Sequence, residues 1–358
     1  MISHKTISIS QPLEKMGQPK WQRIILLSVL GYEGTGALTG GSLLMLAPDG
    51  RLMDMPVEIM HGAFRDFFIP GVILFGLGIL ATAAFVAVLR RTRSNWVLAS
   101  SSLGGFAVWF WVEIAILLDL HWLHLMWGLP VIVGGLAAVP LVPEEYRRKV
   151  LLLCGILSSL LYAAINIIVP TQWKTYDSSS QVVSELSAIG APTQTLWVVL
   201  ATPYTFLIIA FGWGVWKSAT ENRRLRVAGT FLIAYGALGF LWPFAPMHLR
   251  ETLAAGGGTF SDTMHLALGA VTEMLYLLAL AFAASALGGD FRRYSITTCV
   301  VLLVFGVLTF LGAPGIGKNE PTPLIGIWER INIGVFLLWV VVLATILLRR
   351  ELAAGVER

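Results

Sequence analysis

The chain is built from long apolar runs separated by short polar segments, and this pattern limits the fold more than any other feature. About ten runs of roughly 20 residues follow one another along the 358 residues. A helix rises about 1.5 Å per residue, so a run of about 20 residues crosses a hydrocarbon core of about 30 Å. Only 13% of the residues are charged, against about 25% in soluble domains. The sequence therefore predicts an all-α polytopic membrane helix bundle with about ten transmembrane helices.

The expected spans are joined by connections that are mostly short. We expect Tyr32-Glu33-Gly34 to interrupt the first one, because it places a carboxylate and a glycine inside an apolar run. No stretch alternates between apolar and polar residues, and an open sheet would leave backbone groups unpaired in lipid. The ten predicted ranges are about 21–46, 68–89, 96–118, 123–142, 150–169, 193–216, 227–245, 264–287, 296–313 and 324–348.

The Lys and Arg residues alternate from one side of the membrane to the other. Most of the 25 lie in the two tails and in the loops after the second, fourth, sixth and eighth spans. Cytoplasmic loops carry the excess of Lys and Arg, so we expect a multi-pass protein of the inner (plasma) membrane with both termini cytoplasmic. The net charge of +4 then reflects topology rather than nucleic-acid binding, and membrane lipids are the expected partners. The cations of the opposite, outer side are Arg51, Arg65, Lys174, Arg250 and Lys318.

A charged segment, PEEYRRK at 143–149, separates the first four spans from the last six. We therefore predict a cytoplasmic tail at 1–20, a four-span unit at 21–145 and a six-span unit at 146–358. Each unit has one span followed by a long outer loop with a carboxylate, Glu58 in one and Glu185 in the other. This similarity is compatible with a diverged repeat of the transporter type and equally with chance.

Ionisable side chains inside the spans are candidates for a functional site, because a charge in hydrocarbon is unfavourable. Glu33, Glu113 and Glu273 lie in the first, third and eighth spans. Glu329 and Arg330 are neighbours in the tenth span and point about 100° apart, so we expect them to pair with other helices rather than with each other. The alternative for such carboxyls is a hydrogen-bonded packing role. The predicted substrate-binding residues are Glu33, Glu113, Glu273 and Arg65.

The histidines gather on the outer side together with carboxylates. Asp262 and His265 stand three residues apart at the start of the eighth span, so they share a helix face. Asp262 suits an N-cap, and an imidazole inside the first turn of a span needs a polar partner. Glu185, His248 and Asp262 are the candidate partners of His265. The histidine and carboxylate spacings do not form a paired ligand set, so no metal site is predicted.

Three motifs of the second half carry a family resemblance. Tyr176-Asp177 is followed by Val183-Ser184-Glu185-Leu186 and Gly190-Ala191-Pro192; Trp242-Pro243-Phe244-Ala245-Pro246 then ends a glycine-containing span, and His265 opens the next one. Over residues of about 150–350 the chain resembles an uncharacterised prokaryotic integral-membrane family, domain of unknown function 998. An acidic residue expected after the last proline is replaced by Met247-His248. The resemblance implies a six-span helical unit with its polar motifs on the outer side, and it implies no activity.

Three functional hypotheses follow. The first is a protein that binds or acts on a lipid or another apolar small molecule at the outer face, with His265 as the acid/base and with Asp262, Glu185, Ser184 and His248 around it. The second is a proton-coupled secondary transporter that uses the intramembrane carboxylates. The third is an accessory or structural membrane subunit without catalysis. The first hypothesis requires the Ser-Glu-Leu loop to converge with the start of the eighth span, and the sequence leaves open whether the chain is an enzyme.

Overall fold

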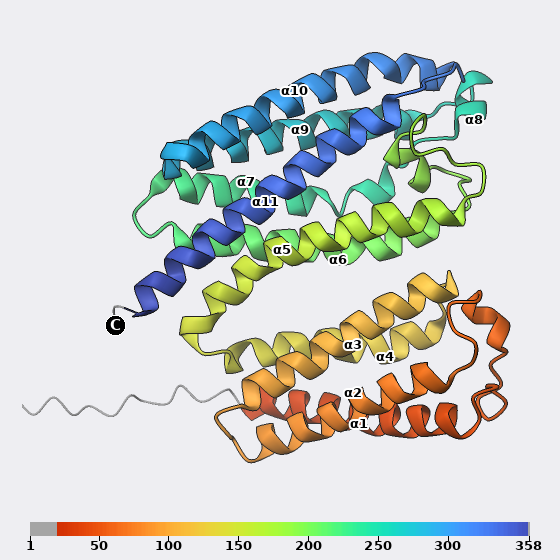
Figure 1. Cartoon of the computed structure of the whole chain (residues 1–358), viewed down its shortest axis with the longest axis vertical. Helices are drawn as coiled ribbons and strands as arrows, with labels where there is room; N and C mark the ends of the chain where they lie inside the picture. The colour runs from red at the N-terminus through yellow and green to blue at the C-terminus, as the bar shows by residue number, and fades with distance from the viewer. Residues whose placement is uncertain (1–19, 357–358) are drawn as a thin grey trace, which may run out of the picture. The chain divides into compact units, whose positions relative to one another are not determined.

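The computed structural model describes residues 20–356, and this part of the chain is helical, with no β-strand (Figure 1). Nine of its helical segments are long and apolar enough to cross a membrane, and they match the second to the tenth expected spans. The chain is therefore a multi-span membrane protein with an all-α fold. The helices are α1 Lys20–Leu46, α2 Phe68–Leu89, α3 Asn95–Leu117, α4 Trp122–Ala138, α5 Glu144–Ile168, α6 Gln194–Ser218, α7 Arg223–Leu238, α8 Arg250–Ala254, α9 Phe260–Leu287, α10 Gly289–Gly317 and α11 Ile325–Val356.

The first expected span differs from the other nine. Helix α1 has 27 residues, which is enough to cross the hydrocarbon core, but it is not among the nine helices that are also sufficiently apolar. It runs without a break through Tyr32-Glu33-Gly34, so the predicted interruption is wrong. A single carboxylate does not end a helix in an apolar setting, because the helix satisfies its own backbone groups there. A membrane crossing by α1 and the cytoplasmic position of both termini stay predictions.

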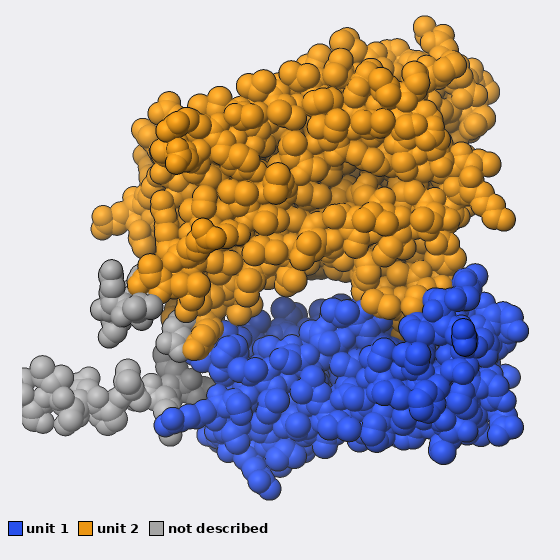
Figure 2. Space-filling model, viewed as in Figure 1, with its two compact units in different colours: residues 1–110, 121–143 blue, residues 111–120, 144–358 orange. Residues whose placement is uncertain are grey.

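The chain divides into two compact units, which we describe separately (Figure 2). Unit 1 comprises residues 1–110 and 121–143, and unit 2 comprises residues 111–120 and 144–358. In unit 1, helix α1 packs along α2 at very short range. A Cβ placed on Gly41 would lie 2.6 Å from the backbone nitrogen of Phe75, and one placed on Gly71 would lie 2.9 Å from the Leu44 side chain. Glycines therefore allow these two helices to meet backbone to backbone, as small residues do in membrane helix pairs.

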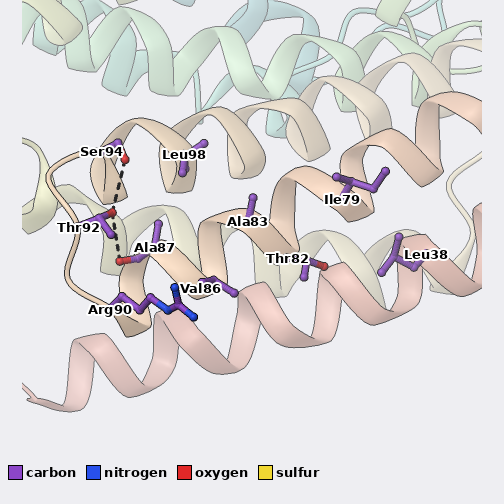
Figure 3. A pocket seen from close by; sticks show the side chains of 10 residues that line it. All are labelled: Leu38, Ile79, Thr82, Ala83, Val86, Ala87, Arg90, Thr92, Ser94 and Leu98. Atoms are coloured by element: carbon purple, nitrogen blue, oxygen red, sulfur yellow. Dashed lines mark hydrogen bonds between the residues drawn. The ribbon is translucent and has the colours of Figure 1, made fainter.

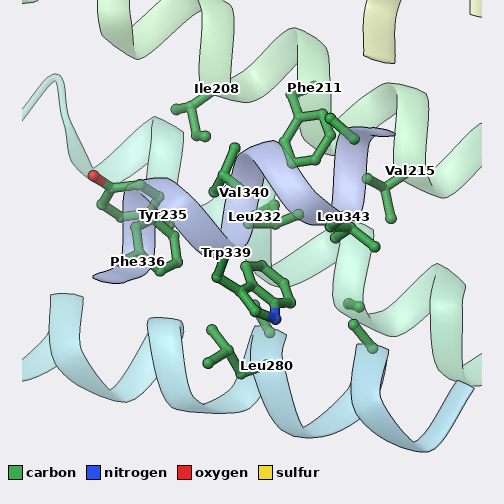
Figure 4. Packing of buried hydrophobic residues seen from close by; sticks show 14 of the residues in the cluster. Ile208, Phe211, Val215, Leu232, Tyr235, Leu280, Phe336, Trp339, Val340 and Leu343 are labelled. Carbon is green, nitrogen blue, oxygen red and sulfur yellow. The ribbon is translucent and has the colours of Figure 1, made fainter. Parts of the chain in front are cut away.

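Helix α11 forms the centre of unit 2. Its residues Phe336, Trp339, Val340 and Leu343 are fully buried, among side chains of α6, α7 and α9 (Figure 4). The indole nitrogen of Trp339 donates to the Ser295 hydroxyl of α10 at 3.0 Å. Helix α11 thus shares one core with residues of α6, α7, α9 and α10.

Three tyrosines place polar atoms inside this core. The hydroxyls of Tyr204 and Tyr235 are 2.7 Å apart, and the Tyr276 hydroxyl donates to that of Tyr235 at 3.1 Å. The rings come from α6, α7 and α9. Buried hydroxyls need hydrogen-bond partners, and here each finds one on a neighbouring helix. The three helices are therefore joined by a hydrogen-bonded link as well as by apolar packing.

The loops α5–α6, α7–α9 and α10–α11 pack together, and we call this part of the molecule the loop end of unit 2. The α5–α6 loop contains a 3-10 turn, Val183–Ser187, and the α7–α9 loop contains the short helix α8. The main-chain nitrogen of Ile189 donates to the Met247 carbonyl at 2.8 Å, and Ile189 forms an isolated bridge with His248. Two loops that are distant in sequence are thereby fixed side by side.

Candidate functional site

Arg250, the first residue of α8, is the centre of a polar cluster at the loop end of unit 2. Its guanidinium donates to both carboxylate oxygens of Glu185, at 2.8 and 2.7 Å. It also donates to the Ser180 carbonyl at 2.8 Å and to the Thr322 hydroxyl at 2.7 Å. Glu185 is 1% exposed and accepts a further hydrogen bond from the Gln181 side chain. This bidentate, charge-assisted pair is fully satisfied inside the protein and links three loops.

Ser184 and Glu329 form the adjoining part of this cluster. The hydroxyl of Ser184 donates to one oxygen of Glu329 at 3.3 Å, and the main-chain nitrogen of Val183 donates to the other. A nucleophilic serine needs a neighbouring base that removes its proton, commonly an imidazole. The Ser184 hydroxyl instead donates a hydrogen bond to the Glu329 carboxylate, and this contact joins the loop to α11.

Arg330 binds the same loop from the next position of α11. Its guanidinium donates to the carbonyls of Ser178 and Gln181 at 2.7 and 3.1 Å and to the Tyr176 hydroxyl at 2.7 Å. Glu329 and Arg330 point apart, as expected, but their partners lie in the loop at 176–184 rather than on other spans. The expectation of helix partners is therefore wrong, because both residues lie near the start of α11, beside the loop.

Tyr176 and Asp177 complete the loop at 176–184. Burial raises the pKa of the Tyr176 hydroxyl, although the hydrogen bond from Arg330 opposes this effect. Asp177 is exposed, and hydrogen bonds from the Ser180 hydroxyl and from the Ser179 backbone and side chain lower its pKa to about 2. Each hydrogen bond favours the charged carboxylate over the protonated form. Asp177 therefore remains an anion that shapes the turn.

A second cluster contains two of the predicted catalytic residues, His248 and Asp262. The Nδ1 atom of His248 lies 2.9 Å from one oxygen of Asp262, and the main-chain nitrogen of His248 donates to the other oxygen at 2.8 Å. Because a carboxylate accepts, Nδ1 carries the proton, and in the neutral imidazole Nε2 then presents its lone pair. The two side chains are 14% and 19% exposed. A carboxylate that orients an imidazole in this way is the arrangement found behind general bases.

Asp262 has a further role at the start of α9. The N-cap of this helix is Thr259, and Asp262 is the third helical residue, whose carboxylate accepts from the Thr259 nitrogen at 2.8 Å. The expectation that Asp262 is itself the N-cap is wrong by three positions. The pattern is a capping box, in which the side chain at the third position satisfies the N-cap nitrogen. Asp262 thus connects the helix start to the His248 segment.

His265 has a different partner from any that the sequence suggested. Its Nδ1 lies 2.9 Å from the Ala245 carbonyl oxygen, and its ring stands edge-on to Trp242 at 4.9 Å between centroids. A carbonyl accepts only, so Nδ1 donates. His265 therefore anchors the Trp242–Ala245 turn to α9. An imidazole inside the helix can reach this turn because the turn folds back onto the helix.

The two clusters are joined through residues 247–250. Arg250 reaches Glu185, His248 reaches Asp262, and the intervening main chain pairs with Ile189. The Ser-Glu-Leu loop and the start of α9 are thus fastened to the same short segment. The loop and the start of α9 belong to two neighbouring clusters, and each cluster has its own charged pair. They do not form a single site around His265.

The four predicted substrate-binding residues lie elsewhere. Glu33 is buried in unit 1, and its Oε1 has no hydrogen-bond partner within residues 20–356. Arg65 is exposed on the α1–α2 loop of the same unit, and Glu113 is half-buried in the part of α3 that belongs to unit 2. Glu273 lies halfway along α9, in unit 2.

Glu273 has a polar neighbour inside the helix bundle. It is hydrogen-bonded to the Asn332 side chain of α11, which also donates to the Leu302 carbonyl of α10 at 2.9 Å. A Cβ placed on Gly306 would lie 3.5 Å from the Glu273 carboxyl and 3.3 Å from the Asn332 amide. Three helices thus meet at one carboxyl, whose Oε1 has no partner in the described chain.

The sequence reasoning missed Arg250 and Arg330 as the organising residues of the loop end. Arg250 was visible as a cation on a side of the chain that carries few of them, and Arg330 as a cation inside a span; each is next to a glutamate in the sequence. A buried guanidinium needs several acceptors, but three of the acceptors here are main-chain carbonyls of the loop after Tyr176, which no residue type marks in the sequence. Residues 20–356 contain no group of three or more His, Cys, Asp or Glu residues that could hold a metal ion.

Comparison with known proteins places these observations in a family. A segment of 55 residues, 15% of the chain, is 44% identical to a UPF0060 membrane protein of Mycolicibacterium vanbaalenii. The chain spans about half the length of that curated relative (51%), and no solved structure matches the chain. The family model described as "Protein of unknown function (DUF998)" matches residues 156–346, just over half of the chain and the region of the predicted resemblance. That region contains both polar clusters, and by this match the chain belongs to the DUF998 family.

Proposed function

We propose that this membrane protein binds a lipid or another apolar small molecule at the loop end of unit 2, with the His248–Asp262 pair as the polar group of the site. The observation that carries the proposal is the geometry of this pair. The 2.9 Å contact at Nδ1 fixes the imidazole and leaves Nε2 with a lone pair. The pair is partly exposed, so a ligand atom can reach it.

The surroundings of the pair favour an apolar ligand. Phe244 and Phe260, which flank the α7–α9 loop, are 83% and 76% exposed, and Trp242 lies beside His265. Large exposed aromatic side chains next to a polar pair suit the boundary between lipid chains and headgroups. We place this end of unit 2 at the outer face of the inner membrane, in keeping with the distribution of Lys and Arg.

The remaining predicted catalytic residues take supporting roles in this proposal. Glu185 and Ser184 have their oxygen atoms engaged by Arg250 and Glu329, so they position the loops instead of touching the ligand. His265 anchors the turn that carries Trp242. In this proposal His248 replaces His265 as the residue that accepts a proton or a hydrogen bond from a ligand.

The test uses the full chain reconstituted in nanodiscs with a phospholipid that carries a photoactivatable diazirine. We expect cross-linked peptides to concentrate at residues 240–265, and we expect His248→Gln to reduce their yield about fivefold, the effect of one lost hydrogen bond of about 1 kcal/mol. Glu251→Gln, an exposed substitution three residues away, is the matched control and leaves the yield unchanged. Adducts spread evenly over all apolar helices and insensitive to His248→Gln would overturn the proposal.

Proton-coupled transport is the second candidate function, and Glu273 favours it. This carboxyl lies halfway along a membrane-spanning helix, has one oxygen without a partner in the described chain, and contacts Asn332 of α11. Intramembrane carboxyls of this kind mark proton and ion pathways.

Infrared difference spectroscopy after a pH step tests this second candidate on the reconstituted protein. A proton-handling Glu273 gives a carboxylic C=O band that disappears in Glu273→Gln and shifts in Asn332→Ala. Glu113→Gln is the control and leaves that band in place. A spectrum without any band that depends on Glu273 would refute this candidate while leaving the first one intact.

A further inference from the structure

Unit 1 contains a groove that takes no part in either proposal above. It has a volume of about 570 Å³ and lies along α2, with contributions from α1 and from the start of α3 (Figure 3). This volume falls in the usual range of small-molecule sites, about 300–1,000 Å³. Three of its four polar residues, Arg90, Thr92 and Ser94, lie together at one end, and the fourth, Thr82, lies toward the other end with Leu38 and Ile79.

The apolar part of the groove results from small side chains between larger ones. Ala83 lies between Ile79 and Val86 along α2, Ala87 follows Val86, and Leu98 of α3 also lines the groove. Ile79 is 54% exposed although it lies in the middle of a membrane-spanning helix. Such a surface faces hydrocarbon in a bilayer, so an acyl chain is its natural occupant.

The polar end of the groove carries an unpaired cation. The guanidinium of Arg90 makes no hydrogen bond or ion pair within residues 20–356, whereas Arg23 nearby is engaged by the Leu89 carbonyl. The hydroxyls of Thr92 and Ser94 are 3.4 Å apart at the same end. These are the donors that suit a phosphate group, because guanidinium and hydroxyl groups both donate to its oxygens.

The charge balance of this end favours an anion. Arg91 and Arg93 lie in the same loop as Arg90, and the sequence has no Asp or Glu from 67 to 112. Each Lys or Arg near an anionic membrane surface contributes about 1 kcal/mol of attraction. A ligand with a negative headgroup and an apolar tail therefore matches both ends of the groove at once.

We propose that this groove is a binding site for an anionic glycerophospholipid, whose phosphate contacts Arg90, Thr92 and Ser94 and whose acyl chain lies along α2 from Val86 to Ile79. A free phosphate ion would leave the apolar length of the groove without a partner. A zwitterionic lipid fills the apolar length, but its choline group meets a cluster of three arginines.

The test is native mass spectrometry of the full chain in detergent, titrated with dioleoylphosphatidylglycerol or dioleoylphosphatidylcholine. We expect the anionic lipid to bind at least about tenfold more tightly, in line with three nearby cations. Arg90→Gln lowers this preference severalfold and Arg90→Lys retains it. Arg292→Gln, an exposed arginine of unit 2 without a side-chain partner in the described chain, is the matched charge control and leaves the preference unchanged.

A second pair of variants tests the apolar part separately. Ala83→Phe fills the groove and weakens binding of both lipids, whereas Val133→Phe adds a ring to an exposed site on α4 and has no effect. Inorganic phosphate at millimolar concentration does not displace the lipid. Equal effects of Arg90→Gln and Arg292→Gln, unaltered binding in Ala83→Phe, or full displacement by inorganic phosphate would each overturn the proposal.

Discussion

Substitution of Arg250 by methionine tests the central feature of the loop end. The side chain of Arg250 is buried, and it supplies two hydrogen bonds to Glu185, one to Ser180 and one to Thr322. Methionine keeps most of the apolar stem and removes the guanidinium. The change leaves the Glu185 carboxylate, which is 1% exposed, without its opposite charge.

The expected loss follows from the burial of that carboxylate. Removal of one partner from a buried ion pair destabilises proteins by about 3–5 kcal/mol, because the remaining charge stays desolvated. Glu185 keeps only its hydrogen bonds from Gln181 and from the Val182 nitrogen. Replacement of both partners, Arg250→Met with Glu185→Leu, removes the charge altogether, so we expect the double variant to recover at least about 2 kcal/mol of the single variant's loss.

The assay is reversible unfolding of the purified protein in mixed micelles with increasing sodium dodecyl sulfate, followed by tryptophan fluorescence. The control is Arg293→Gln, which breaks the exposed pair with Asp290 and costs at most about 1 kcal/mol. A free energy of unfolding for Arg250→Met within about 1 kcal/mol of the wild type would refute the reasoning. So would a double variant whose loss equals the sum of the two single losses.

Three further outcomes are expected. Gly326→Ala places a Cβ against main-chain oxygens of the loop at 178–181 and lowers the free energy of unfolding by about 1–3 kcal/mol. Gly269→Ala is the control, because its Cβ has open space, and it causes no such loss. The same micelle titration measures both variants. The lowered pKa of Asp177 stabilises the folded loop above about pH 4, and this contribution disappears as the pH falls through about 2. Ser180→Ala moves the pKa of Asp177, measured by carbon NMR, back toward 3.8. An unchanged pKa contradicts the assignment. Reporter domains fused to either terminus are active only in the cytoplasm; a C-terminal reporter active outside excludes the ten-span arrangement.

The helical architecture was predictable because its signal is local. In lipid every backbone group is satisfied within its own helix, so the run from Phe68 to Leu89 determines a span by itself. The sequence predicted ten spans, and nine of them match helices that are long and apolar enough to cross a membrane. The predicted interruption of the first span at Glu33 was wrong, because α1 continues through Glu33 and packing of α1 buries this carboxylate. Such packing is tertiary, so a local sequence pattern does not reveal it.

The polar residues of the loop end were predictable as a set but not as pairs. Glu185, Asp262, His248 and His265 all appear there, since loop and helix-start positions follow from the span boundaries. Their partners do not follow, because Arg250 and Glu185 are 65 residues apart and meet only when two loops pack together. The Ala245 carbonyl beside His265 was equally invisible, since any residue type supplies a carbonyl.

The sequence by itself determined that the chain is a helical membrane protein, where most of its spans lie and which family it resembles. The length of apolar runs and the spacing of motifs are properties of contiguous sequence, so they are available without the fold. Only the tertiary structure decided which charges neutralise one another, which imidazole is oriented by a carboxylate and where an unpaired arginine meets an apolar groove. The physical reason is that buried charges and hydrogen bonds depend on atoms within about 3 Å, and such neighbours come from segments distant in the chain.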